Sequence, residues 1–171
     1  MAISRRRLCS VGGTLVFIGL AGCLDGTDDG TDTAERSRSD TWAWSGSVPV
    51  ESVVQHHDPS CGCCSEYVAY LETNGVDVTV ETTGDVEGVK RDLGVPEDAA
   101  SCHTIEFGDY LIEGHVPLEA IEELFADQPA VDGLTAPGMP RHSPGMGPPG
   151  DEPLTVYAFE ASGDVFEYTE V

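Results

Sequence analysis

From residue 48 onward, the spacing of apolar residues changes back and forth between the short period of strands and the longer period of helices. In the expected first helix, Tyr67, Val68 and Leu71 lie on one face, and Asn74-Gly75 supplies a C-terminal stop. The pattern predicts a strand at 49–57, a helix that begins within the cysteine segment 61–64 and ends at about Thr73, and a strand at 76–80. A helix at 85–94 and a hairpin of the strands 103–107 and 110–116 follow. The last helix of this series begins at Pro117, and its buried face consists of Leu118, Ile121, Leu124 and Phe125. The order is therefore β-α-β-α-β-β-α.

Capping residues mark the ends of the second helix. Asp85 is expected to cap its N-terminus and Gly94 to end it. The side chains expected to face inward from this helix are Val86, Val89 and Leu93.

The C-terminal part of the chain follows a different pattern. Residues 133–150 are loaded with Pro, Gly and Met, and we predict neither a helix nor a strand there. Residues 153–159 and 165–168 predict a last hairpin that turns at Ser162-Gly163. The predicted fold class is α/β and thioredoxin-like: a central mixed sheet with flanking helices, followed by a Pro/Gly/Met loop and a hairpin.

The N-terminus carries the features of an export leader. Ser4-Arg5-Arg6-Arg7-Leu8 is a twin-arginine (Tat) signature, and the apolar stretch 11–20 is shorter than the about 20 residues that span a bilayer. Leu20-Ala21-Gly22-Cys23 resembles a lipobox. We therefore expect residues 1–22 to be a lipoprotein signal and Cys23 to carry lipid on the outer face of the membrane. An uncleaved anchor or an ordinary apolar leader is the alternative.

Residues 23–47 are rich in Asp, Thr, Ser and Gly, and we expect an acidic, disordered tether interrupted by Trp42 and Trp44. Residues 48–171 are enough for one small core and form the expected domain.

The formal charge of the chain is −23, and loss of Arg5, Arg6 and Arg7 with the leader makes it more negative still. Nucleic-acid binding is excluded as a function, because phosphate contacts need clustered Lys and Arg. The acids are interpreted as the solvated surface of a halophilic protein, because molar salt screens their repulsion.

Candidate chemistry is concentrated in Cys61-Gly62-Cys63-Cys64 and Ser101-Cys102-His103. The fold order brings the loop before the third strand close to the first strand–helix junction, so Cys102 is expected to face the other three cysteines. Thiolates are soft ligands that favour Cu(I), Zn(II) or iron–sulfur centres, and a helix N-terminus favours the thiolate form. Cys61 and Cys64 also have the CxxC spacing of a redox pair.

Cys63 favours copper among these alternatives. Disulfide exchange needs only Cys61 and Cys64, whereas a Cu(I) cluster can use extra bridging thiolates. Thiol–disulfide exchange is the runner-up. Structural zinc, as in an adaptor, or plain disulfides complete the alternatives.

Several stretches of the chain, taken together, resemble the CopG type of small exported proteins associated with copper resistance. They are Pro59-Ser60-Cys61-Gly62-Cys63-Cys64, Gly94-Val95-Pro96, Ser101-Cys102-His103-Thr104, Glu113-Gly114-His115-Val116-Pro117, Gly133-Leu134, Pro137-Gly138-Met139-Pro140 and Ser143-Pro144-Gly145-Met146. The resemblance implies a thioredoxin-like fold and copper binding at the cysteines. Relatives often carry Trp and His where this chain has Tyr67 and Tyr70, and Gly where it has His142.

Four further residues are candidate ligands or supporting groups. His103 and His115 offer imidazoles, although His103 is equally compatible with a buried, backbone-bonded role. Met139 and Met146 offer thioethers for Cu(I), or else plug the underside of their loop.

The sequence thus predicts a lipid-anchored protein that holds copper, Cu(I) in preference to zinc, through Cys61, Cys63, Cys64 and Cys102. Copper resistance or redox handling of copper is the expected task. Whether it is an enzyme, and which copper-transport or copper-oxidase partner it has, stay open.

Overall fold

The computed structural model describes residues 42–171. The predicted signal, the lipidation site Cys23 and most of the predicted tether lie outside the described residues. Within residues 42–171, no helix has the length and apolar character needed to cross a membrane.

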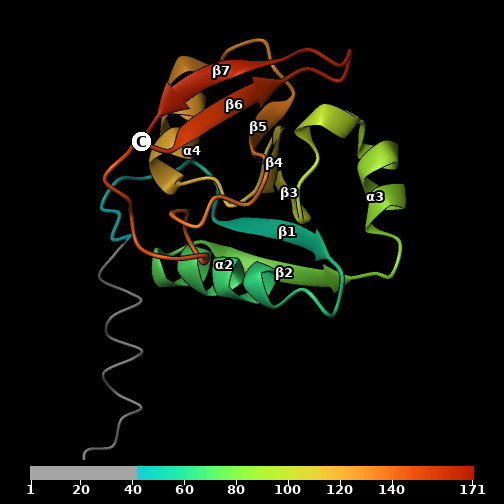
Figure 1. Ribbon diagram of the computed structural model, residues 1–171, viewed down its shortest axis with the longest axis horizontal. Helices are drawn as coiled ribbons and strands as arrows, with labels where there is room; N and C mark the ends of the chain where they lie inside the picture. Colours follow the sequence, from blue (N-terminus) through green and yellow to red (C-terminus); the bar gives the residue numbers. More distant parts are fainter. Residues whose placement is uncertain (1–41) are drawn as a thin grey trace, which may run out of the picture.

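A seven-stranded mixed sheet forms the centre of the structure (Figure 1). The strands are β1 (Ser52–His57), β2 (Asp77–Thr82), β3 (His103–Phe107), β4 (Tyr110–Gly114), β5 (Gly133–Ala136), β6 (Thr155–Phe159) and β7 (Val165–Glu170). Their order in the sheet is β2-β1-β3-β4-β5-β6-β7. The pairs β1–β2 and β4–β5 are parallel, and the other four pairs are antiparallel.

Helices cover both faces of this sheet. They are α2 (Gly62–Thr73), α3 (Val86–Leu93), α4 (Leu118–Asp127) and the short 3-10 helix η1 (Glu97–Ala99). Side chains of α2 and α4 share one buried core with Ile105 of β3 and Ile112 of β4. The chain neighbours Thr104 and Glu113 instead contact Lys90 of α3. Because side chains alternate across a strand, α3 lies on the opposite face from α2 and α4.

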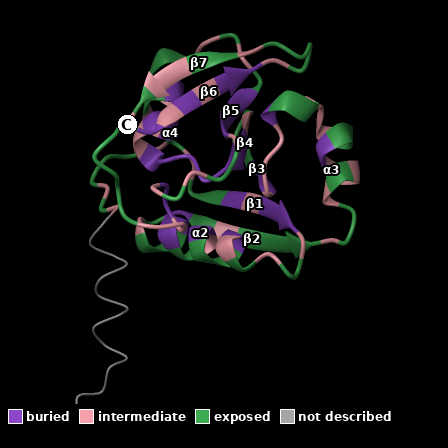
Figure 2. Cartoon of the chain, viewed as in Figure 1, coloured by how far each residue is buried: buried purple, intermediate pink, exposed green. Residues whose placement is uncertain are grey.

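The expected element order is found from β1 to α4. Buried positions concentrate in the central strands and on the inner sides of α2 and α4 (Figure 2). Asp85 caps α3 by accepting a hydrogen bond from the Gly88 N–H at 2.9 Å, and Gly94 ends the helix with a left-handed φ of 84°. Both capping predictions are confirmed.

The prediction that residues 133–150 contain no strand is wrong. Gly133–Ala136 form β5, a fully buried strand between β4 and β6. Position 133 has room only for glycine, because a Cβ there would clash with the Leu111 carbonyl and lie 2.6 Å from the Phe159 ring. Four residues that begin with Gly and precede a breaker-rich loop give too short a pattern to indicate a strand.

The predicted inner face of α3 is also wrong in part. Val86, Val89 and Leu93 are all half-buried, and Leu93 packs on a buried apolar cluster, whereas Lys90 is the buried residue of this helix. Lys90 reaches Glu113 and Thr104, and this polar contact sets the orientation of the helix.

The two tryptophans at the start of the described chain pack on the domain. The Trp42 Nε1–H donates to the Gly147 carbonyl at 2.7 Å. The Trp44 Nε1–H donates to Glu122 of α4 at 3.0 Å.

Candidate metal centre

The cysteine segment starts at the turn that follows β1. The Cys61 N–H donates to the Asp58 carbonyl at 2.9 Å, and the Ser60 N–H donates to the Asp58 carboxylate at 2.8 Å. Asp58-Pro59-Ser60 therefore ends the strand and turns the chain into α2, as such turn residues do elsewhere. Cys61 is the N-cap of α2 and has extended backbone.

The structure brings the four predicted cysteines together. The sulfur atoms of Cys61, Cys63, Cys64 and Cys102 all lie within 4.8 Å of one another. Cys61 and Cys64 form a disulfide with their Cα atoms 5.5 Å apart, and Cys63 and Cys102 are free. The Cys63 sulfur lies 3.6 Å from that of Cys61. Cys102 therefore faces the start of α2, as the element order predicts.

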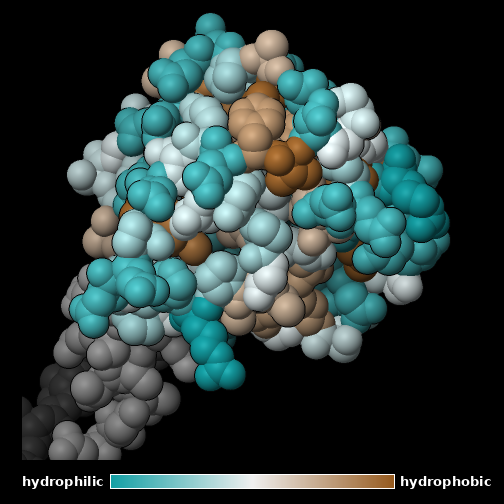
Figure 3. All heavy atoms as spheres, turned by 45° about the horizontal axis from the view of Figure 1, so that its top comes forward, coloured by the Kyte–Doolittle hydropathy of each residue, from teal (hydrophilic) through white to brown (hydrophobic). Residues whose placement is uncertain are grey.

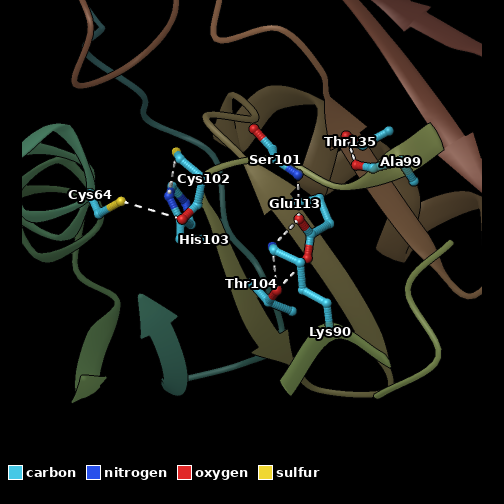
Figure 4. Close-up of polar contacts among 9 residues, drawn as sticks. All are labelled: Cys64, Lys90, Ala99, Ser101, Cys102, His103, Thr104, Glu113 and Thr135. Atoms are coloured by element: carbon cyan, nitrogen blue, oxygen red, sulfur yellow. Dashed lines mark hydrogen bonds and ion pairs between the residues drawn. The ribbon is translucent and has the colours of Figure 1, made fainter. Parts of the chain in front are cut away.

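Cys102 approaches α2 through both its backbone and its side chain. Its carbonyl oxygen lies 3.7 Å from the Cys64 sulfur (Figure 4). Burial, followed by the nearby Cys63, raises the pKa of the Cys102 thiol to about 12. Metal binding at this sulfur would therefore have to displace a proton at neutral pH.

Two buried imidazoles adjoin the cysteines. The His103 Nδ1 lies 3.2 Å from the Cys102 sulfur, and the His115 Nδ1 lies 2.6 Å from the Pro144 carbonyl. A carbonyl can only accept, so the His115 Nδ1 carries the proton in this contact. The Nε2 atoms of both rings are buried and have no hydrogen-bond partner among residues 42–171.

The same imidazoles form a second donor group with Cys102. Donor atoms of Cys102, His103 and His115 lie within 4.8 Å of one another. Burial lowers the pKa of both histidines, for His103 well below the usual range, so both are neutral at pH 7 and able to bind a metal. Neighbouring residues within a strand face opposite sides of the sheet, but Cys102 precedes β3 and only His103 belongs to the strand, so both side chains can reach the same site.

His56 and His57, which precede the cysteine segment, point to different places. His56 forms contacts with Glu106 at 2.8 Å and Glu81 at 3.5 Å. His57 lies 3.1 Å from the Gln55 amide, which also donates to the Cys64 carbonyl at 3.0 Å. Only His57 is therefore connected to the cysteine helix.

The Pro/Gly/Met loop packs on α2 and His115. A Cβ at Gly145 would lie 2.8 Å from the Tyr67 backbone nitrogen, which shows how closely the loop approaches the helix. Met146 is half-buried, whereas Met139 is 44% exposed and has a positive φ of 51°. The two methionines thus have different environments, and Met139 is the more exposed to solvent.

Sequence reasoning missed the polar group beside the centre. Glu113 accepts hydrogen bonds from Lys90 and from the Ser101 N–H, next to Cys102 (Figure 4). The available signal was a single Lys within the apolar stripe of α3 and a Glu on an otherwise apolar strand.

Comparisons with known proteins agree with this site. A family model described as "Protein of unknown function, DUF411" matches residues 99–146, which include Cys102, His103 and His115. No curated protein matches the chain. Two solved structures, named "Copper resistance protein copG- Form 1" and "Form 2", are each 37% identical to it, with TM-scores of 0.62 and 0.61. The first match covers 72% of this chain and 98% of the other, and the second covers 70% and 97%. The chain therefore belongs to the CopG family of copper resistance proteins.

Proposed function

We propose that this protein binds copper as Cu(I) in a thiolate cluster formed by Cys61, Cys63, Cys64 and Cys102 after the disulfide is reduced. The observation that carries the proposal is the placement of Cys63. It adds a third sulfur to the CxxC pair and lies within 4.8 Å of all the other sulfurs. Such a set of soft ligands favours Cu(I), and the names of the similar structures agree with that metal.

The neighbouring imidazoles extend this donor set. Cys102 belongs both to the four-sulfur group and to the group with His103 and His115. A structural zinc site needs only four donors around one ion. A sulfur that belongs to two donor groups suits a cluster in which two copper ions share that sulfur better than it suits a single zinc ion. Met139 and Met146 of the Pro/Gly/Met loop are further soft ligands that could complete such a cluster.

Thiol–disulfide exchange is the second candidate, and the Cys61–Cys64 disulfide favours it. We infer that β1 to β4 with α2, α3 and α4 form a thioredoxin-like unit, with this pair at the β1–α2 junction. The same pair could also handle copper redox chemistry. Two thiolates that reduce two Cu(II) ions to Cu(I) give up one electron each and form the disulfide, which balances the reaction.

The two candidates are separated by a Cys63→Ser variant. Serine replaces a soft bridging sulfur with a hard hydroxyl, so Cu(I) affinity or stoichiometry should fall, whereas the Cys61–Cys64 couple keeps both its sulfurs. Reduced wild type and variant are titrated with Cu(I) against a chromophoric chelator, and both are assayed for insulin reduction. Equal copper binding by the two proteins, with strong reductase activity in the wild type, would favour the oxidoreductase instead.

We also propose that the protein is exported and attached to the outer face of the membrane through lipid on Cys23, as a haloarchaeal-type lipoprotein. The support is the order of twin arginines, apolar stretch and lipobox in residues 4–23. A Cys23→Ser variant should appear in the medium or stay uncleaved, and cell fractionation with a size comparison detects either. A variant that remains membrane-bound at the wild-type size and amount would refute the lipid anchor.

A further inference from the structure

A buried carboxylate lies directly behind the Cys102 loop. Glu113 of β4 is fully buried, and its Oε2 accepts a hydrogen bond from the Lys90 Nζ at 2.6 Å and from the Ser101 N–H at 2.8 Å. Its other oxygen accepts from the Thr104 hydroxyl, which also accepts from Lys90 at 2.9 Å. Figure 4 shows this group next to Cys102.

Stability alone does not explain this group. Taking both charges out of water has a large desolvation cost, and apolar residues of similar volume often serve as well or better. Lys90 is 2% exposed and Glu113 0% exposed, so the pair carries that full cost. A role in fixing one conformation accounts better for its presence.

The conformation that it fixes is that of residue 101. The Ser101 N–H is bound by Glu113, and the Ser101 side chain packs against Gly114. A Cβ at Gly114 would lie 2.8 Å from the Ser101 Cβ and 3.1 Å from the Ala136 carbonyl oxygen, so no larger residue fits without a shift. Ser101 is thus held from two sides, directly before the residue that supplies the fourth sulfur.

We propose that Glu113, with its charge balanced by Lys90, is a positioning residue that holds Cys102 against the cysteines of α2. The carboxylate oxygen of Glu113 holds the loop by accepting the Ser101 N–H. Lys90 offsets the cost of burying that negative charge. The consequence for copper rests on the proposed function, but the placement of Cys102 does not.

Two double variants separate the acceptor from the charges. Lys90→Met with Glu113→Gln, the amide variant, removes both charges and keeps an amide oxygen for the Ser101 N–H. Lys90→Met with Glu113→Leu, the apolar variant, removes both charges and the acceptor as well. Both replace the ion pair with neutral groups of similar volume, which proteins often tolerate.

The measurement is the alkylation rate of Cys102, followed by peptide mass spectrometry on the full chain with the Cys61–Cys64 disulfide intact. Cys102 should react about tenfold faster in the apolar variant than in the amide variant, because an unsatisfied N–H loosens the loop. The control is the urea unfolding midpoint of each protein, which shows that the fold as a whole is kept and that only the Cys102 loop has loosened. Cys63, the other free thiol of the described chain, contacts Cys102, so its alkylation rate should follow that of Cys102 in the same direction.

A third variant covers the case in which the apolar variant does not fold. Ser101→Pro removes the N–H donor, and Ala100 already has the extended backbone that precedes a proline. It should also raise the alkylation rate of Cys102 while the urea unfolding midpoint shows a folded protein. Equal Cys102 rates in the two double variants, or a wild-type rate in Ser101→Pro, would overturn the proposal.

Copper binding is tested separately on the reduced proteins. The apolar variant should bind less Cu(I) than the amide variant, since its fourth sulfur is no longer held in place. If the wild type binds no Cu(I), the proposed function fails while the alkylation result still decides the role of Glu113.

Discussion

Single residues determine how tightly the Pro/Gly/Met loop can close over the centre. Gly145 has a φ of 76°, and its Cα faces the backbone of α2 at Tyr67. Gly138 has the same φ of 76° but no atom within 4 Å of where its Cβ would be. The two glycines therefore share the same positive φ and differ in what a Cβ would contact.

Alanine at these two positions separates strain from packing. Gly138→Ala should cost about 1 kcal/mol of unfolding free energy, for the left-handed backbone alone. Gly145→Ala should cost roughly 1–3 kcal/mol more, because its Cβ would press on helix backbone that cannot turn away. Urea unfolding of both variants measures the difference. An equal cost would mean that the loop does not pack on α2 as closely as the structure has it.

At the residue scale, the sequence allows prediction of which cysteines meet but not what supports them. Strand order was enough to bring Cys102 to the start of α2, because a topology places whole segments. The contact between Lys90 and Glu113 could not be predicted from the strand order, because in the sequence each residue looks like one more surface charge of an acidic protein. Only their burial, which depends on how α3 tilts on the sheet, distinguishes them.

Among the secondary-structure elements, α3 shows which features can be predicted from nearby residues alone. Asp85 and Gly94 act within their own turn, so the helix ends follow from the sequence. β5 is the opposite case, because its four residues become a strand only between β4 and β6. The inner face of α3 also depends on partners far along the chain, and its apolar pattern alone did not indicate that Lys90 is its most buried side chain.

The Asp85 cap of α3 should contribute measurably to the free energy of unfolding. Asp85→Ala should lower the unfolding free energy by about 1 kcal/mol, because the Gly88 N–H loses its side-chain acceptor and keeps only the Asp85 carbonyl at 3.1 Å. Glu87→Ala is the matched control in the same first turn, where an acid acts only through the helix dipole and is worth a few tenths of that amount. Denaturant unfolding of both variants gives the comparison. If the two cost the same, the side-chain cap is not formed in solution.

For the whole molecule, charge is the dominant feature. The chain has 31 acidic and only 8 basic residues, and the face drawn in Figure 3 is largely hydrophilic with small apolar patches. The buried Lys90–Glu113 pair joins a base to an acid within residues 42–171, and the neutral or charged His56 lies near Glu81 and Glu106. Most surface acids therefore repel one another without a nearby cation, and this repulsion opposes the folded state.

Salt should therefore stabilise the protein strongly. Raising NaCl from about 0.1 M to about 1 M shortens the Debye length from about 10 Å to about 3 Å, which screens most repulsion between surface acids. We expect Tm to rise by several degrees, since about 1 kcal/mol shifts Tm by roughly 4 °C in a domain of this size. Differential scanning fluorimetry over a salt series measures the rise, and sucrose, which strengthens burial without screening charge, is the control. A Tm that responds to sucrose as much as to salt, or to neither, would show that the acidic surface is not what limits stability.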